Sequence, residues 1–406
     1  MPSLTTLIRS GHWPSLLGAW LHFEVSFMVW MLMGALGVSI ADNLALTSTQ
    51  MGLLLAMPLL SGAIWRVPVG LASDRIGAKR MGSVILLAEL AGLVWGATGA
   101  TSFVSLLCVS LLLGAAGASF AVALPIAGRA YPAEYQGMAL GIAASANSGV
   151  VLAMFVGPRV AATVGWQATF GWMALPVLCT WALFLVAVQA DPTRSSAGAD
   201  SWSWATVRRD LVRDPAWRWL CGLYALTFGG FVGLSSVLPL LLHHQYGLSI
   251  IEAGSTTALC GLTGTLLRPV GGAVADRLGS LRVLPVVLAT VAGLLSGLAA
   301  APPLLLASVL AWGAIGAMGF GNGVVFRLVA DRFPTRIGLA SGIVGAAGAA
   351  GGMFLPLCIG GLRDVTGGYA MGLWICAVLV GATALVVGRF PLRATAPTPD
   401  SLCSLR

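Results

Sequence analysis

Long apolar stretches separated by short polar connections recur along the whole chain. A helix needs roughly 20 apolar residues to cross a membrane, so the pattern predicts about twelve spanning helices. The chain is thus expected to be an all-α membrane protein. We place five spans near 15–40, 51–72, 81–100, 103–127 and 137–158, with a sixth that ends near 189; the others lie near 217–242, 250–273, 283–300, 305–330 and 338–361, with a twelfth that ends near 389.

Two similar stretches indicate an internal repeat. RVPVGLASDRIGAKR begins at Arg66, and RPVGGAVADRLGSLR begins 202 residues later at Arg268. In both, Asp-Arg and then a glycine follow the apolar arginine segment, and glycines near 137 and 338 match at nearly the same offset. We therefore expect two pseudo-symmetric six-helix halves, at 1–190 and 217–390, with a linker at 191–216 and a tail at 391–406.

Charge is scarce and unevenly distributed. Only 9% of residues are charged, against roughly 25% in a soluble domain. The net charge of +8 could suggest nucleic-acid binding. However, Arg159 and Arg363 are the only Lys or Arg residues expected in connections on one side, and nearly all others fall on the opposite side. This asymmetry predicts a multi-pass membrane protein with both termini in the cytoplasm, in contact with lipid and not with nucleic acid.

The sequence lacks the usual motifs of cofactor, metal and nucleotide sites. None of the seven cysteines has CxxC spacing, and the single lysine, Lys79, does not follow a glycine-rich phosphate loop. We expect no cofactor, no metal site, no disulfide framework and no enzymatic or nucleotide-driven activity.

Arg66 and Arg268 are the strongest candidates for chemistry. Each lies eight residues, or about 12 Å of helix, inside the polar Asp-Arg pair, which is close to the middle of a core about 30 Å thick. A charge at that depth costs on the order of 3 kcal/mol. Two guanidinium groups, one from each half, would bind a small planar oxyanion; the alternative is that each arginine pairs with a buried acid, and Glu89 could neutralise Arg66.

Other residues inside the spans are weaker candidates by position alone. Tyr224 and Phe228 are one helical turn apart, Phe120 follows a small-residue run, and all three could be packing residues. Asn147 would be costly to bury without a partner. Glu24, with His22, and Glu89 could carry protons, although Glu24 and His22 could also reach the lipid headgroups. His243 and His244 are expected in a hydrated loop at the opposite end.

Several stretches resemble the major facilitator superfamily, and more specifically its nitrate/nitrite porters. GLASDRIGAKR and GGAVADRLGSLR are similar to the loop motif that the superfamily carries between its second and third spans and again between its eighth and ninth. The similarity to the porters extends over nearly the whole chain. Its matching stretches are SFMVWMLMGALGV (26–38), SGAIWRVPVGLASDR (61–75), GAAGASF (114–120), LYALTFGGFVG (223–233), LLRPVGGAVADRLG (266–279), GNGVVFR (321–327) and GAAGAAGGMFLP (345–356).

The resemblance implies roles for particular residues. Arg66 and Arg268 would clamp the anion, Phe120 and Phe228 would sandwich its flat face, and Tyr224 and Asn147 would supply hydrogen bonds. The two halves would rock between alternating-access states, with a gating motif between them. In this chain that motif consists of Asp74, Arg75, Asp276 and Arg277. A monomer is expected.

The coupling mechanism is open at this point. Porters that exchange nitrate for nitrite are understood to lack a protonatable group in the pathway, whereas this chain has Glu24, His22 and Glu89. We expect a nitrate importer with possible proton symport, with nitrate/nitrite exchange as the alternative mode. A facilitator for another small anion, or an exporter of drugs, is the rival class. Nitrate and nitrite cannot be ranked, since both are small planar anions.

Overall fold

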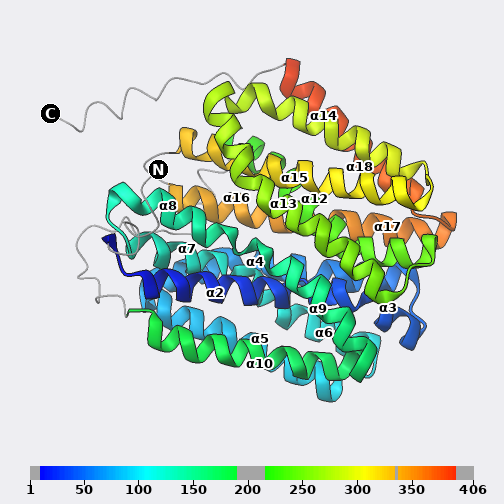
Figure 1. Ribbon diagram of the computed structural model, residues 1–406, viewed down its shortest axis with the longest axis horizontal. Coiled ribbons are helices and arrows are strands. Elements are labelled where there is room, and N and C mark those ends of the chain that lie inside the picture. The colour runs from blue at the N-terminus through cyan, green and yellow to red at the C-terminus, as the bar shows by residue number, and fades with distance from the viewer. Residues whose placement is uncertain (1–9, 190–214, 334–336, 390–406) are drawn as a thin grey trace.

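The computed structural model describes residues 10–189, 215–333 and 337–389, and within these ranges the regular structure is entirely helical (Figure 1). Twelve helical segments there are long and apolar enough to span a membrane. The expected all-α class with twelve spans is confirmed. The expected linker at 191–216 falls almost wholly outside the described residues, and the tail at 391–406 falls wholly outside them.

The first six spans contain several helix breaks. The first span consists of two helices that meet at Met31, and the fourth and fifth each contain a short 3₁₀ segment. The six spans are formed by α2 (Trp13–Trp30) with α3 (Leu32–Leu44); α4 (Ser48–Ile76); α5 (Ala78–Gly99); α6 (Phe103–Leu113), η1 (Gly114–Ala118) and α7 (Phe120–Arg129); α8 (Ala133–Ala144), η2 (Ser145–Ser148) and α9 (Gly149–Val164); and α10 (Trp166–Ala187).

The last six spans are more regular. One break occurs, where α16 ends at Gly352 and α17 begins at Phe354. The spans are formed by α12 (Pro215–Tyr246), α13 (Ile250–Leu278), α14 (Ser280–Ala299), α15 (Leu304–Arg332), α16 (Ile337–Gly352) with α17 (Phe354–Thr366), and α18 (Ala370–Arg389). In Figure 1, α5 and α10 lie at one margin of the molecule, and α14 and α18 at the opposite margin.

The internal repeat is visible in the ends of α4 and α13. Each helix has 29 residues, and each begins with a capping box, formed by Thr47 with Gln50 and by Ser249 with Glu252. Each ends at a glycine with positive φ, Gly77 at 94° and Gly279 at 85°, a conformation that L side chains rarely adopt. Equivalent residues therefore begin and end the two arginine-bearing helices.

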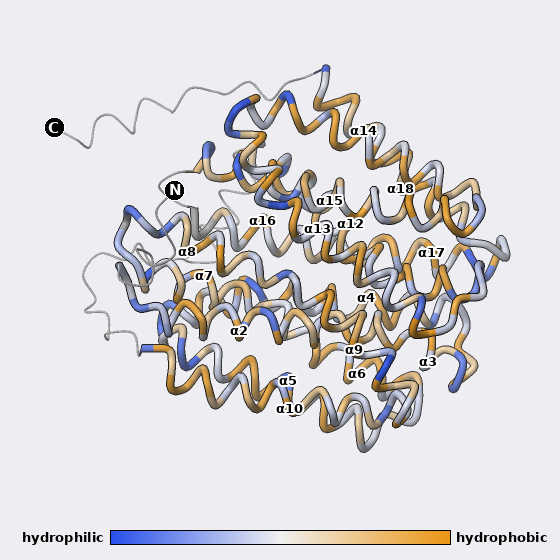
Figure 2. Tube along the Cα trace, viewed as in Figure 1, coloured by the Kyte–Doolittle hydropathy of each residue, from blue (hydrophilic) through white to orange (hydrophobic). Residues whose placement is uncertain are grey.

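The outer surface of the bundle is apolar. Large side chains such as Leu183 of α10, Leu305 of α15 and Val378 of α18 are more than half exposed. Polar residues gather toward the two ends of the bundle, as Figure 2 shows. A soluble monomer rarely exposes so much apolar surface, so this is a multi-pass membrane protein.

The first and seventh spans are the most buried of the twelve, and they pack against each other. At their crossing, a side chain on Gly34 would come within 2.9 Å of the Ser236 backbone. This close approach brings the arginine-bearing regions of the first six and last six spans next to one another in the centre of the bundle.

Candidate functional site

Arg66 is buried in the centre of the bundle without an acidic partner. Its side chain is 3% exposed. Its Nε donates a hydrogen bond to the Gly117 carbonyl at 2.8 Å, and its Nη1 donates to the Gly345 carbonyl of α16. Arg66 forms no ion pair with Glu89 or any other acid in the described ranges. No carboxylate therefore neutralises this guanidinium, which lies next to the last six spans.

Arg268 is also buried, and it is only partly satisfied. Its Nη2 donates to the Tyr224 hydroxyl across a long 3.4 Å contact, and its guanidinium lies 5.1 Å from the Phe326 ring centre. Its Nη1 has no hydrogen-bond partner among the described residues. A buried charged donor without a partner is costly, and an anion in this position would relieve that cost.

Aromatic rings surround the two guanidinium groups. Tyr224 and Phe228 stack in parallel, with their centroids 5.0 Å apart and their planes 4° from parallel. The Arg66 guanidinium carbon lies 5.5 Å from the ring centres of Phe228, Phe120 and Trp30 alike. These rings make the surroundings of the arginines less polar than water, so hydrogen bonds from the arginines to a bound anion would be stronger than in water.

Glycines allow the helices that carry the site to pack closely. A Cβ at Gly323 of α15 would lie 1.9 Å from the Arg268 carbonyl oxygen, and a Cβ at Gly348 of α16 would lie 2.4 Å from the Tyr224 ring. A Cβ at Gly345 would meet Arg66 Nη1 at 2.9 Å. The glycine-rich stretches of α15 and α16 are thus required by the positions of the arginines and of Tyr224.

A cavity of about 760 Å³ connects the arginines to one end of the bundle. Its walls include Arg66, Arg268, Phe120 and Phe326, and they extend to Asp74, whose side chain is exposed. The cavity therefore provides a path from the two arginines to the end of the bundle at which α4 finishes.

The opposite end is closed by contacts between the first six and last six spans. The Asp364 carboxylate of α17 accepts hydrogen bonds from the backbone nitrogens of Ser48 and Thr49 at 2.9 and 2.8 Å, and from the Thr49 hydroxyl at 2.5 Å. This carboxylate caps the N-terminus of α4 from a distant helix, and Gly52 of α4 packs against the Pro356 carbonyl nearby. The structure is open at one end and closed at the other.

Asp364→Asn is expected to weaken the closed end. The substitution removes the negative charge that interacts with the start of α4. Losing such a helix cap costs about 1 kcal/mol, which shifts the equilibrium between the two states roughly fivefold toward the state open at that end. Spin labels at Asn43 of α3 and Val365 of α17, in a cysteine-free background, would show a larger fraction of molecules in which the two labels are far apart. The control is Glu252→Gln, which alters the equivalent cap of α13 within its own helix. An unchanged distance distribution in Asp364→Asn would show that this contact does not control the closed end.

Of the remaining candidates, one lies on the cavity wall and two lie behind it. Phe120 lies on its wall, whereas Asn147 is buried in η2 with its Oδ1 unpartnered among described residues, next to the wall residues Ala144 and Ser145. Glu24 accepts a 2.6 Å hydrogen bond from the Ser148 hydroxyl. Glu24 of α2 and Asn147 of η2 thus both lie where these two elements pack against each other.

His22 and Glu89 are fully buried. His22 Nε2 contacts the Gly82 carbonyl at 3.1 Å, and the His22 ring packs on Phe184 with centroids 4.9 Å apart. The Glu89 carboxylate lies beside the Ser26 hydroxyl, but neither of its oxygens forms a hydrogen bond of normal length in the described part of the chain. The expectation that His22 could reach lipid headgroups is wrong, because neighbouring helices enclose its side chain.

The two Asp-Arg motifs lie at the cavity end of the bundle, and all four side chains are exposed. Asp74 pairs with Arg129 at 3.3 Å, and Asp276 pairs with Arg327 at 2.7 Å. Each pair joins spans of the same group of six. These pairs therefore hold α4 to α7 and α13 to α15, and a gating role for Arg75 and Arg277 stays a prediction.

The family of the chain is decided by a comparison with protein-family models. Residues 19–326 match the model of the Major Facilitator Superfamily. The chain belongs to this superfamily. A solved structure of a bacterial homolog of the human lysosomal transporter Spinster, inward-facing and unoccupied, superimposes on this facilitator with a TM-score of 0.71 at 18% identity, over 93% of this chain and 95% of that one. The superposition shows that the fold is shared.

Two curated relatives cover nearly the whole facilitator. The "Nitrite extrusion protein" of Bacillus subtilis is 32% identical over 369 residues, covering 90% of this chain and 91% of its own. The "Probable nitrate/nitrite transporter NarK2" of Mycobacterium tuberculosis is 34% identical over 383 residues, covering 91% and 93%. The facilitator is similar to both along almost their full length.

Sequence reasoning missed three residues near the arginines. Trp30 and Phe326 complete the aromatic surroundings, and Thr265, one turn before Arg268, lies on the cavity wall with a hydroxyl that has no partner among the described residues. Trp30 and Phe326 lie in stretches that already resembled the porters, SFMVWMLMGALGV and GNGVVFR. Thr265 could have been found from its i, i+3 spacing to Arg268.

Proposed function

We propose that this protein is a secondary transporter, and not an enzyme, that moves nitrate and nitrite across the bacterial cytoplasmic membrane. The observation that carries the proposal is the pair of buried arginines, Arg66 and Arg268, which have no acidic partner among the described residues and meet an aromatic-lined cavity. Two planar guanidinium groups suit a small planar oxyanion. The names of the two relatives support nitrate and nitrite as the anions.

Transport would proceed by alternating access. In the proposed orientation both termini are cytoplasmic, so the cavity opens to the cytoplasm and the Asp364 contacts close the outer end. The six-helix halves, at 1–190 and 217–390, would rock about the arginines of a single monomer. In this scheme Phe120 and Phe228 hold the flat faces of the anion, while Tyr224 and Asn147 offer hydrogen bonds.

Competition tests the choice of substrate. Uptake of labelled nitrate by cells that express the protein should fall in the presence of excess nitrite and stay unchanged with bulky organic anions of the same charge. A rival facilitator for organic anions or drugs would give the reverse order. Inhibition by bulky anions but not by nitrite would refute the proposed substrate class.

We propose import with possible proton symport as the main mode, with nitrate/nitrite exchange as the alternative. Glu24 and Glu89 are the candidate proton carriers, with His22 beside Gly82, because they are buried or nearly so and form no ion pair in the described ranges. Glu24 is partly satisfied by Ser148, whereas Glu89 has only the nearby Ser26 hydroxyl and forms no hydrogen bond of normal length among the described residues.

Glu24→Gln and Glu89→Gln separate these two modes. If either carboxylate carries the coupled proton, its glutamine variant loses uptake driven by an inward proton gradient, by about tenfold or more, and retains exchange of nitrate for nitrite. The control is Gln167→Glu, which exchanges the same two side chains in the opposite sense at the far end of the bundle, near Ala100. Gradient-driven uptake that is unchanged in both variants would remove these carboxylates from the coupling mechanism.

A further inference from the structure

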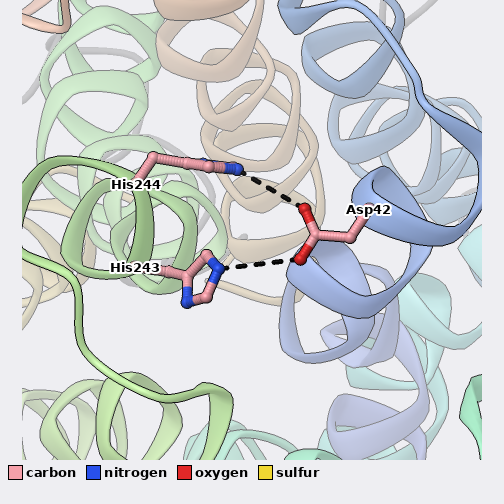
Figure 3. A group of neighbouring side chains, drawn as sticks. All are labelled: Asp42, His243 and His244. Atoms are coloured by element: carbon pink, nitrogen blue, oxygen red, sulfur yellow. Dashed lines mark ion pairs between the residues drawn. The ribbon is translucent and has the colours of Figure 1, made fainter.

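Three side chains with metal-binding atoms meet at the closed end of the bundle. Asp42 lies near the end of α3, and His243 and His244 lie in the last turn of α12 (Figure 3). The Asp42 carboxylate is 3.6 Å from His243 Nε2 and 3.8 Å from His244 Nε2, and the three ligand atoms lie within 4.8 Å of one another. The expectation that both histidines lie in a hydrated loop is therefore wrong, since the helix continues through them to Tyr246.

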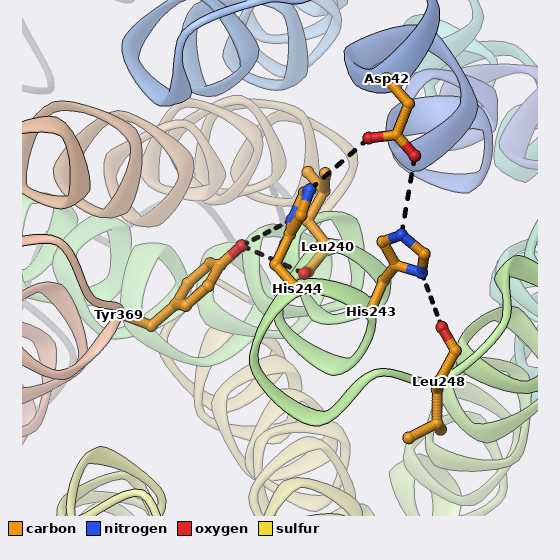
Figure 4. A network of polar contacts seen from close by, with 6 residues as sticks. All are labelled: Asp42, Leu240, His243, His244, Leu248 and Tyr369. Carbon is orange, nitrogen blue, oxygen red and sulfur yellow. Dashed lines mark hydrogen bonds and ion pairs between the residues drawn. The ribbon is translucent and has the colours of Figure 1, made fainter.

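Hydrogen bonds determine which nitrogen of each imidazole carries a proton. His243 Nδ1 lies 2.6 Å from the Leu248 carbonyl, which can only accept, so Nδ1 is the donor (Figure 4). His244 Nδ1 lies 3.1 Å from the Tyr369 hydroxyl, which itself donates to the Leu240 carbonyl at 3.1 Å. His244 Nδ1 therefore also donates. In the neutral form, both Nε2 atoms carry lone pairs that face the Asp42 carboxylate.

This arrangement calls for a cation. Two neutral nitrogen acceptors and a carboxylate repel one another unless a proton or a metal ion supplies positive charge between them. Metal-bound histidines in proteins typically donate their other ring N–H to a carbonyl or similar acceptor, and both histidines do so here. Tetrahedral zinc, with ligands at about 2.0–2.2 Å, needs ligand atoms about 3.3 Å apart. The three ligand atoms lie within 4.8 Å of one another, and each histidine is nearest to a different Asp42 oxygen, so the side chains must move closer together to bind the ion.

Neighbouring charges favour a site that binds reversibly. Arg363 of α17 stacks on Tyr369, with its guanidinium 4.7 Å from the ring centre, and its positive charge acts on His244. Asp364 is engaged at the start of α4. In the described part of the chain Asp42, His243 and His244 are the whole group of potential ligands; the Asp42 side chain is 55% exposed and the two histidine side chains are partly exposed. Water would thus complete the coordination shell.

We propose that Asp42, His243 and His244 form a binding site for a divalent transition metal of the zinc class, and that the bound ion holds the closed end shut. Asp42 belongs to the first six spans and both histidines to the last six, so the ion would join two groups that must separate when that end opens. Inhibition of transport by the ion rests on the proposed function; binding of the ion does not.

Binding is measured first, by titrating the purified full-length protein with zinc in a calorimeter. We expect one zinc ion per chain, with an affinity that falls at least about tenfold in His243→Ala and in Asp42→Asn. The affinity should also fall between pH 7.5 and pH 6, because the ion competes with protons for the imidazoles. His12→Ala, at the opposite end of the first span, is the matched control and should bind as the unaltered protein does. Absence of binding, or equal affinity in all variants, would overturn the site.

Transport is measured second, with zinc added to the side of the membrane that the closed end faces. Zinc should inhibit nitrate uptake by the unaltered protein and by His12→Ala, and His243→Ala and His244→Ala should resist the inhibition while their uptake without zinc persists. Zinc binding without any inhibition would overturn the role in closure. If neither the unaltered protein nor any variant transports nitrate, the proposed function fails, and the calorimetric test of the site still stands.

Discussion

Arg268→Gln is expected to lower nitrate uptake at least about 100-fold. The arginine has an unpartnered buried Nη1 and only a 3.4 Å contact from Nη2, so most of its donor capacity is available to an anion. A hydrogen bond to a charged group contributes about 1.5–3 kcal/mol, and two of them correspond to at least two orders of magnitude. Initial rates of labelled nitrate uptake, normalised to the amount of protein in the membrane, measure the effect.

Two further variants show whether this loss reflects anion binding. Arg268→Lys keeps the charge and loses the planar pair of donors, so it is expected to recover only part of the activity. Arg282→Gln makes the same change at an exposed arginine at the start of α14 and should transport normally. Full activity in Arg268→Gln would contradict the proposed role of the arginine in the site.

Gly323→Ala is expected to destabilise the protein by about 3 kcal/mol and to abolish uptake. The added Cβ would lie 1.9 Å from the Arg268 carbonyl oxygen and 2.7 Å from the Gly272 nitrogen, so α13 and α15 must move apart. Overpacking of a tight interface costs 1–3 kcal/mol and sometimes more, and here both obstructing atoms belong to backbone. Because Arg268 is carried by the displaced helix, anion binding is lost together with stability.

Gly293→Ala is the control for this substitution. Gly293 lies in α14, and a Cβ there meets nothing within 4 Å. Alanine stabilises an unobstructed helix by roughly 1 kcal/mol relative to glycine, so the temperature of unfolding in detergent should stay the same or rise. Equal unfolding temperatures for the two variants would show that the α13–α15 crossing tolerates separation.

The fold was predictable because a membrane allows few solutions. Long apolar runs had to become spanning helices, and the repeat of RVPVGLASDR as RPVGGAVADR predicted that α4 and α13 would be equivalent, as their matching caps confirm. The breaks inside spans were not predicted. Met31 is as apolar as its neighbours, and the 3₁₀ segments η1 and η2 occur where small residues pack against other helices, a tertiary effect.

The candidate site was only partly predictable. Buried arginines are costly enough to be conspicuous in a sequence, and Tyr224 and Phe228 were correctly expected on one helix face, where they stack. Trp30 and Phe326 could not be distinguished from packing aromatics, because their proximity to the arginines depends on how helices cross. The ligand roles of His243 and His244 depend on Asp42, some 200 residues away, and no spacing within the chain indicates that contact.

The central claim is that the two arginines form a nitrate site that faces each side of the membrane in turn. The most direct measurement is uptake of labelled nitrate by purified protein in liposomes, loaded with nitrite or left empty, with and without an inward proton gradient. The account predicts nitrate entry in at least one arrangement: into nitrite-loaded liposomes if the protein exchanges, or into empty liposomes under the gradient if it is a symporter. No nitrate entry under any of the four conditions would contradict it.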